Sequence, residues 1–110
     1  MNNIKAYTAG SDIEGNRFIT FDTAEGVVKM ATASSVVIGT TGYIGSVAEK
    51  IVDVDHNRLV EVQVGGTVAV GDGLISDANG KAVKAGEGVS PIAIALASGT
   101  ADAIIFVLMK

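Results

Sequence analysis

Short apolar runs rich in Val, Ile and Thr alternate along this chain with clusters of turn-forming Gly, Asp and Asn. The alternation of single residues is clearest in LVEVQV (59–64), where three valines are expected to face the interior while Glu61 and Gln63 face solvent. Many short strands with frequent turns are typical of sandwiches and barrels. We therefore predict an all-β protein, a small β-sandwich or barrel-like domain of short strands and tight turns.

Two further apolar stretches carry specific expectations. In TVAV (67–70), the same alternation predicts that Val68 and Val70 face inward. The run AIIFVLM (103–109) is continuously apolar, which is typical of a strand covered on both faces. We expect this strand to lie in the centre of a sheet or at a subunit interface.

Residues 1–12 differ from the rest because they are polar and rich in turn formers. They predict a flexible N-terminal arm, with residues 13–110 forming a single β domain. Such an arm could order on a partner by adding a strand to an exposed sheet edge. Ser46 followed by Glu49 would suit a short helix, but the density of Val and Ile around them favours extended chain.

The segment VAVGDGLISDANGKAV (68–83) holds the strongest turn signals. Asn79-Gly80 predicts a two-residue type I′ hairpin turn, and Gly71-Asp72-Gly73 predicts a second tight corner. Phosphate binding would need a following helix N-terminus or a lysine, and a strand follows instead. We therefore interpret these five residues as structural turns.

Composition bears on partners. In a chain of 110 residues, 48% are hydrophobic and 18% are charged, so part of the apolar surplus is expected on the surface, where a partner subunit would cover it. The net charge is −4 without a basic block, which argues against nucleic-acid binding. The longest apolar run is too short for a membrane span, and the N-terminus lacks a signal-peptide pattern. We expect a soluble protein made in a cytoplasm.

Candidate chemistry is sparse. The absence of cysteine excludes disulfides and thiolate nucleophiles. The single histidine, His56, lies among Asp53, Asp55 and Asn57, which match the first ligand positions of an EF-hand loop, but the required Gly and Glu do not follow. His56 is therefore expected to be solvated at a hairpin tip. We predict no catalytic residues, cofactor, metal or small-molecule substrate, and hence no enzyme.

One alternative remains open at this point. The pair Lys29-Met30 is similar to the modified Lys-Met of biotin-carrying domains. Lys29 follows a Val-Val run, however, so it is expected inside a strand and not at a hairpin tip that a ligase could reach. The alternative function is a non-catalytic β-domain that acts as a binding or biotinyl/lipoyl-like carrier module.

Three segments carry a broader resemblance: 7–42, 60–85 and 90–109. The middle one contains GGTVAVGDGLISDANGKAV (65–83), which matches a GG-x-V-x-x-GD-x-L-x-x-D-x-x-G-x-A-V pattern. The chain resembles the small capsid decoration, or cement, proteins of tailed bacteriophages. It departs from them where IGIAL reads IAIAL (92–96) and where the last GD reads Ala101-Asp102, so the turn geometry expected at those points differs.

This resemblance implies an all-β homotrimer that binds the major capsid protein on the outer surface of the virion, at local three-fold positions. It implies stabilisation of the expanded head, with the protein present in the host cytoplasm during assembly. No catalytic motif or cofactor comes with the family. For the interface we expect Tyr7 in the arm, and Ile104, Phe106 and Leu108 in the last strand.

Overall fold

The computed structural model describes residues 3–33 and 35–110, which form an all-β protein of two five-stranded sheets. The predicted fold class is confirmed. The ten strands are β1 (Ile4–Ala9), β2 (Phe18–Phe21), β3 (Val27–Met30), β4 (Gly39–Thr41), β5 (Ile51–Asp55), β6 (Leu59–Gln63), β7 (Gly73–Ser76), β8 (Ala82–Lys84), β9 (Ala93–Ala95) and β10 (Ile104–Met109). Among the described residues, no helix is long and apolar enough to cross a membrane.

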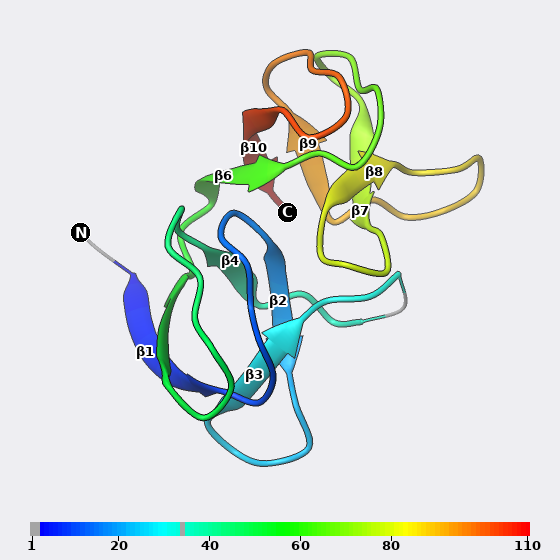
Figure 1. Ribbon diagram of the computed structural model, residues 1–110. Helices are drawn as coiled ribbons and strands as arrows, with labels where there is room; N and C mark the ends of the chain where they lie inside the picture. The colour runs from blue at the N-terminus through cyan, green and yellow to red at the C-terminus, as the bar shows by residue number, and fades with distance from the viewer. Residues whose placement is uncertain (1–2, 34) are drawn as a thin grey trace.

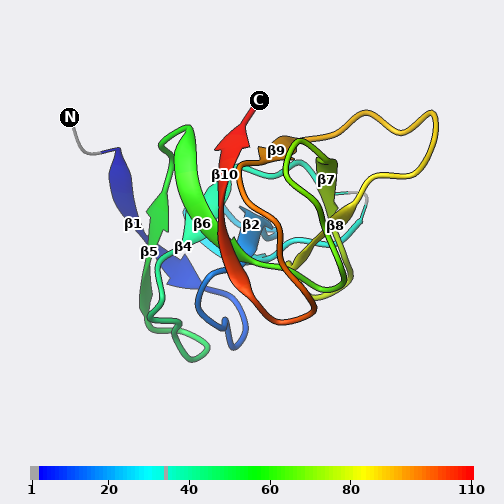
Figure 2. The ribbon, with the colours of Figure 1, turned by 90° about the horizontal axis from the view of Figure 1, so that it is seen from above.

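The first five strands close into a small barrel in the order β1-β3-β2-β4-β5, with β1 also paired to β5. All pairs are antiparallel except β1–β3. The last five strands form an antiparallel sheet in the order β6-β10-β9-β7-β8. The barrel lies at the bottom of Figure 1 and the second sheet at the top, and Figure 2 shows them side by side. The chain thus completes one sheet before it begins the next.

The apolar interior is divided into two clusters. One cluster fills the barrel around Ile19 and Val54, and the other lies under the second sheet. Neighbouring residues of β2 serve both, because Phe18 packs into the second cluster while Ile19 packs into the first. In β6 the predicted alternation is confirmed, since all three valines of LVEVQV are buried.

The N-terminal segment differs from the flexible arm that we expected. Ile4–Ala9 forms β1, which pairs with β5 over five residues and with β3 over two, so it is an integral strand of the barrel. Residues 1–2 of the expected arm lie outside the described residues. The polar composition misled because most side chains of β1 are exposed, while its backbone is held by a strand more than forty residues away.

One local expectation is also wrong, and another is met in part. Val70 is 65% exposed, because it occupies a turn in which the Asp72 amide donates to the Ala69 carbonyl. The strand β10 lies inside its sheet, between β6 and β9, as expected, and its burial alternates, with Ile105 and Val107 buried and Phe106 half exposed. One of its faces is therefore uncovered in the single chain.

Candidate functional site: two exposed surfaces and the joint between the sheets

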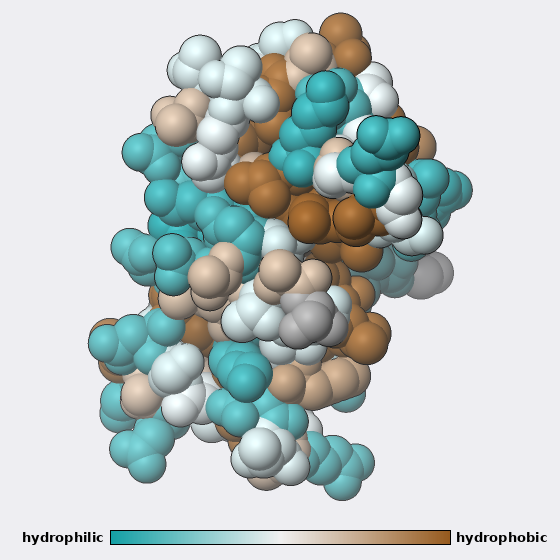
Figure 3. Space-filling model, turned by 90° about the vertical axis from the view of Figure 1, so that its right-hand side faces the viewer, coloured by the Kyte–Doolittle hydropathy of each residue, from teal (hydrophilic) through white to brown (hydrophobic). Residues whose placement is uncertain are grey.

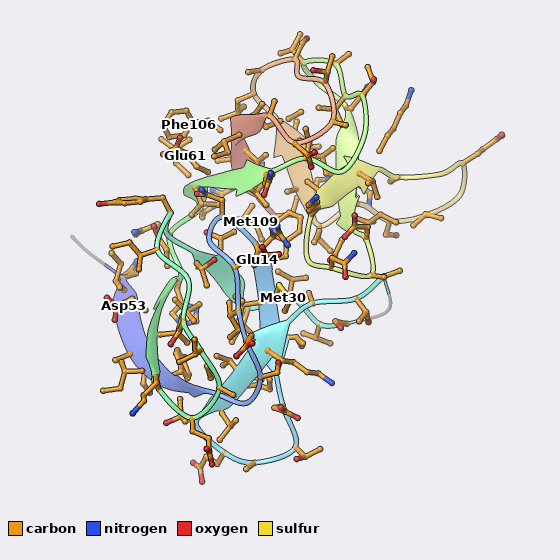
Figure 4. All side chains as sticks on the ribbon, viewed as in Figure 1. Glu14, Met30, Asp53, Glu61, Phe106 and Met109 are labelled. Atoms are coloured by element: carbon orange, nitrogen blue, oxygen red, sulfur yellow. The ribbon has the colours of Figure 1, made fainter. Side chains whose placement is uncertain are left out.

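The uncovered side of the second sheet carries an apolar surface. β10 pairs with β6 and β9, so outward side chains from three strands come together: Leu108 lies opposite Leu59 and Ile94, and Phe106 lies opposite Glu61. We call this surface the sheet face and define it by Leu59, Ile94, Leu96, Ile104, Phe106 and Leu108. In Figure 4, Phe106 and Glu61 project together away from the ribbon.

The exposure of the sheet face is large for a single chain. Ile104 and Phe106 are each 49% exposed and Leu59 is 56% exposed. Contiguous apolar surface of this kind marks contact sites for other proteins. The structure brings together three of the four expected interface residues, Ile104, Phe106 and Leu108. Sequence reasoning missed Leu59 and Leu96, which only the strand pairing places beside them.

Tyr7, the fourth expected interface residue, lies elsewhere. It is half-buried in β1, and its hydroxyl is 2.9 Å from Nε2 of His56. Its ring packs edge-on against Phe21 and His56, and the Lys5 ammonium lies 5.4 Å from the ring centre. These contacts belong to the barrel and not to the sheet face.

His56 is not the solvated side chain that we expected. Besides the contact with Tyr7, its Nδ1 lies 2.6 Å from the carbonyl oxygen of Ile38, so both ring nitrogens have protein partners. The neighbouring Asp55 carboxylate accepts hydrogen bonds from the Asn57 backbone and side-chain amides. Within residues 3–33 and 35–110, no group of three His, Asp or Glu side chains is arranged to hold a metal ion.

The loop at Asn79-Gly80 is a turn, but not of the predicted type. Type I′ requires positive φ at both residues, and only Gly80 has it, with φ +76°. The loop is longer, because Asp77 and Lys81 are joined by a backbone hydrogen bond and Oδ1 of Asp77 accepts from the amides of Asn79 and Lys81. A left-handed glycine after such a turn is typical of a three-residue hairpin loop with a bulge.

The other predicted corner combines two kinds of constraint. Gly71 has φ +89° in open space, and Oδ2 of Asp72 accepts from the amide of Ala69. Gly73 already belongs to β7, where a side chain would meet Pro91. The five turn residues therefore shape the backbone.

The Asn79-Gly80 loop also joins the two sheets. The Gly80 carbonyl accepts from the Phe18 amide of β2 at 2.7 Å. The guanidinium of Arg17, a residue that is 5% exposed, donates to the Asn79 carbonyl and to Oε1 of Gln63, and forms an ion pair with Glu14. In Figure 4, Glu14 and Met30 mark this region between the sheets. Arg17 thus connects the barrel with β6, at one edge of the second sheet, and with the β7–β8 loop at the other edge.

Nearby, a surface ion pair joins two loops. Nζ of Lys81 lies 2.7 Å from Oδ1 of Asp102, and this hydrogen bond and charge hold the pKa of the Asp102 carboxyl below its ordinary value. The backbone of Asp102 adopts φ +71°, and its carbonyl accepts a hydrogen bond from Nε2 of the Gln63 side chain. This contact orders the loop before β10.

A second exposed surface lies beside the barrel. A hollow of about 290 Å³ runs along the outer side of β1 and β5 under the loop 42–45, and a second of about 200 Å³ continues from it toward Glu61 and Ile104. They share Gly42, Tyr43 and Asp55. We call the two together the groove. The sequence feature that could have indicated the groove is GTTGYIG (39–45), in which Tyr43 and Ile44 form an apolar pair between two glycines.

The loop that overhangs the groove is firmly held. The backbones of Ile13 and Ser46 exchange two hydrogen bonds of 2.7 Å, and the Asn16 amide donates to the Gly42 carbonyl at 2.9 Å. A side chain at Gly15 or Gly45 would collide with the backbone of the facing segment. This close backbone packing leaves no room inside the protein for the side chains of Tyr43 and Ile44, which therefore point outward.

Other features lack the geometry of a site. Lys29 lies within β3, paired to Thr20 of β2, as expected, and not at a hairpin tip. A further apolar band on the side of β7 and β8 is visible in Figure 3, between hydrophilic areas.

The fold and the exposed surfaces define a small all-β protein, a five-stranded barrel joined to a five-stranded sheet. Its structure is similar to the N base of the head fiber protein gp8.5 of bacteriophage phi29, with a TM-score of 0.82 and 14% sequence identity, over 100% of this chain and 95% of that one. A protein of a phage head therefore has this fold, which is consistent with the resemblance to phage decoration proteins. No family model matches the sequence, and no curated protein matches it.

Proposed function

We propose that this chain is a structural protein of a bacteriophage head that binds the outer surface of the capsid shell. The observation that carries the proposal is the similarity over the whole chain to the base of a phage head fiber. The sequence pattern of residues 65–83 supports the same class of protein. The exposed sheet face and groove are surfaces of the kind that bind other proteins. The partner is the major capsid protein, and no catalytic step is involved.

The sheet face is the proposed contact between copies. A closed ring of three copies buries one face of each subunit against its neighbour, which removes apolar surface from water. A trimer fits the local three-fold positions of a capsid. The exposed Ile104 and Phe106 are its expected centre, because large apolar side chains in the middle of an interface contribute most of the binding free energy.

Stabilisation of the head follows from mass action. A protein that binds the expanded shell, and not its disrupted form, shifts the equilibrium toward the intact shell. At a free concentration one hundred times Kd, the stabilisation is about 2.7 kcal/mol for each occupied site. Many sites on one shell multiply this effect.

The direct test is co-sedimentation with expanded heads that were assembled without this protein, followed by heating. We expect the chain to sediment with expanded heads and to raise the temperature at which they release DNA. Unexpanded heads are the control for binding to the mature surface. A chain that stays in the supernatant at micromolar concentration, with no change in head stability, contradicts the proposal.

The sheet face has its own test. We expect Phe106→Ser to convert the trimer into monomers, because it replaces the largest apolar side chain of the sheet face, which is 49% exposed, with a polar one. Light scattering gives the mass, and circular dichroism confirms that the strands persist. Val70→Ser is a matched control, since Val70 is an exposed apolar residue outside the sheet face. Wild-type protein that is monomeric, or a Phe106→Ser protein of unchanged mass, argues against this face.

A further inference from the structure

We infer that the groove is the surface that meets the shell, and that it takes an extended segment of the shell protein in which apolar side chains stand beside Lys or Arg. This inference rests on the proposed function and assigns a place and a chemistry to the partner. It gives the two exposed surfaces, which meet at Ile104, different partners: the sheet face joins copies, and the groove binds the shell.

The shape of the groove suits an extended segment. Its two hollows share three residues and pass from the barrel to the edge of the second sheet. Figure 4 shows Asp53, at the barrel end, and Glu61, at the sheet end, on the same side of the molecule. A continuous path across both sheets accommodates a stretch of chain better than it does a compact small molecule.

The apolar part of the groove is unusually exposed. Tyr43 is 82% exposed, Ile44 is 69% exposed and Ile51 is 73% exposed. The backbone hydrogen bonds on either side of Tyr43 and Ile44 hold the loop 42–45 in place before any partner arrives. A loop that is already ordered loses little backbone entropy on binding, and tyrosine is enriched among the residues that contribute most to interfaces. These two side chains are the expected anchors.

Charge identifies the other half of the partner. Asp53, Asp55 and Glu61 line the groove, and its lining contains no Lys or Arg. Among the described residues, none of these carboxylates forms an ion pair within 4.0 Å. A segment that carries Lys or Arg would meet them favourably. A second copy of this chain is a poorer occupant, because it carries a net charge of −4.

The charge is tested with the double variant Asp53→Asn, Glu61→Gln. We expect it to bind expanded heads about ten-fold more weakly at low salt, and to lose affinity less steeply as salt rises, because attraction between exposed charges is screened by salt. The matched control is Glu25→Gln, Glu87→Gln, which makes the same charge change in exposed loops away from the groove. Binding is measured by quantitative co-sedimentation at two salt concentrations.

The apolar anchors are tested with the double variant Tyr43→Ser, Ile44→Ser. We expect about ten-fold or greater loss of head binding with unchanged salt dependence, since no charge is altered. Its control is Val36→Ser, because Val36 is a 78% exposed apolar residue outside the groove. Circular dichroism and light scattering on each variant confirm that the fold and the oligomeric mass are those of the wild type.

The outcomes separate this inference from the proposed function. If the wild type does not bind heads, the proposed function fails. If the wild type binds and both groove variants bind equally well, the groove assignment alone is overturned. A change of oligomeric mass in the Tyr43→Ser, Ile44→Ser variant, whose residues lie outside the sheet face, would show that a second copy occupies the groove, which also overturns it.

Discussion

Replacement of Arg17 by methionine is expected to lower the free energy of unfolding by about 3 kcal/mol. The guanidinium of this residue is almost fully buried, and it supplies donors to the Gln63 side chain and to the Asn79 carbonyl. Methionine fills similar volume but leaves both acceptors without these donors inside the protein. These hydrogen bonds lie between the barrel and the second sheet, so we expect both sheets to be destabilised in a single transition.

Urea denaturation followed by circular dichroism measures this effect. Arg58→Met is the matched control, because Arg58 is exposed and, within the part of the chain that the structure describes, its side chain donates only to the carbonyl of Met109. Arg17→Lys separates charge from geometry, since an ammonium cannot reproduce the planar fork of donors. If Arg17→Met costs no more than Arg58→Met, the joint does not depend on this guanidinium.

The second large effect is expected for Gly80→Val, which we predict to cost about 3 kcal/mol or to abolish folding, and with it the yield of the proposed trimer. Two costs add. Gly80 has φ +76°, which a β-branched residue adopts poorly, and a Cβ there would lie 2.8 Å from the Phe18 carbonyl oxygen. This steric collision falls beside the hydrogen bond that the Phe18 amide donates to the Gly80 carbonyl.

A control at Gly88 separates the two costs. Gly88 has φ +78°, but an added Cβ would meet nothing within 4 Å. Gly88→Val therefore reports backbone strain alone, at about 1–2 kcal/mol. Equal losses in thermal denaturation for the two variants would show that Gly80 does not pack closely against β2. A Gly80→Val protein that is soluble, of the same oligomeric mass and as stable as wild type would contradict the role of this turn.

The sequence predicted features that depend on neighbouring residues. The alternation of residues 59–64 and the place of Lys29 in a strand were correct, because a strand's two faces follow directly from residue order. The class of fold was also accessible, since it follows from many short strands and turns. Three of the expected interface residues came together because they alternate along one strand.

Features that depend on distant partners could not be predicted. β1 was mistaken for an arm because its partner β5 lies far along the chain. His56 appeared solvated because neither Tyr7 nor the Ile38 carbonyl is near it in sequence. The groove escaped notice for the same reason, since it combines a loop, the outside of the barrel and the edge of the second sheet.

The arrangement of strands also limits how these molecules can associate. A closed barrel has no free strand edge, so only the second sheet ends in edge strands, β6 and β8. β8 is three residues long and ends in Lys84, and beside β6 the amide of Gln63 already donates to the Asn16 carbonyl. Short, charged or occupied edges resist backbone pairing between molecules. Copies of this chain are therefore expected to resist polymerising edge to edge even at high concentration, which leaves side chains of the exposed surfaces to make contacts between molecules.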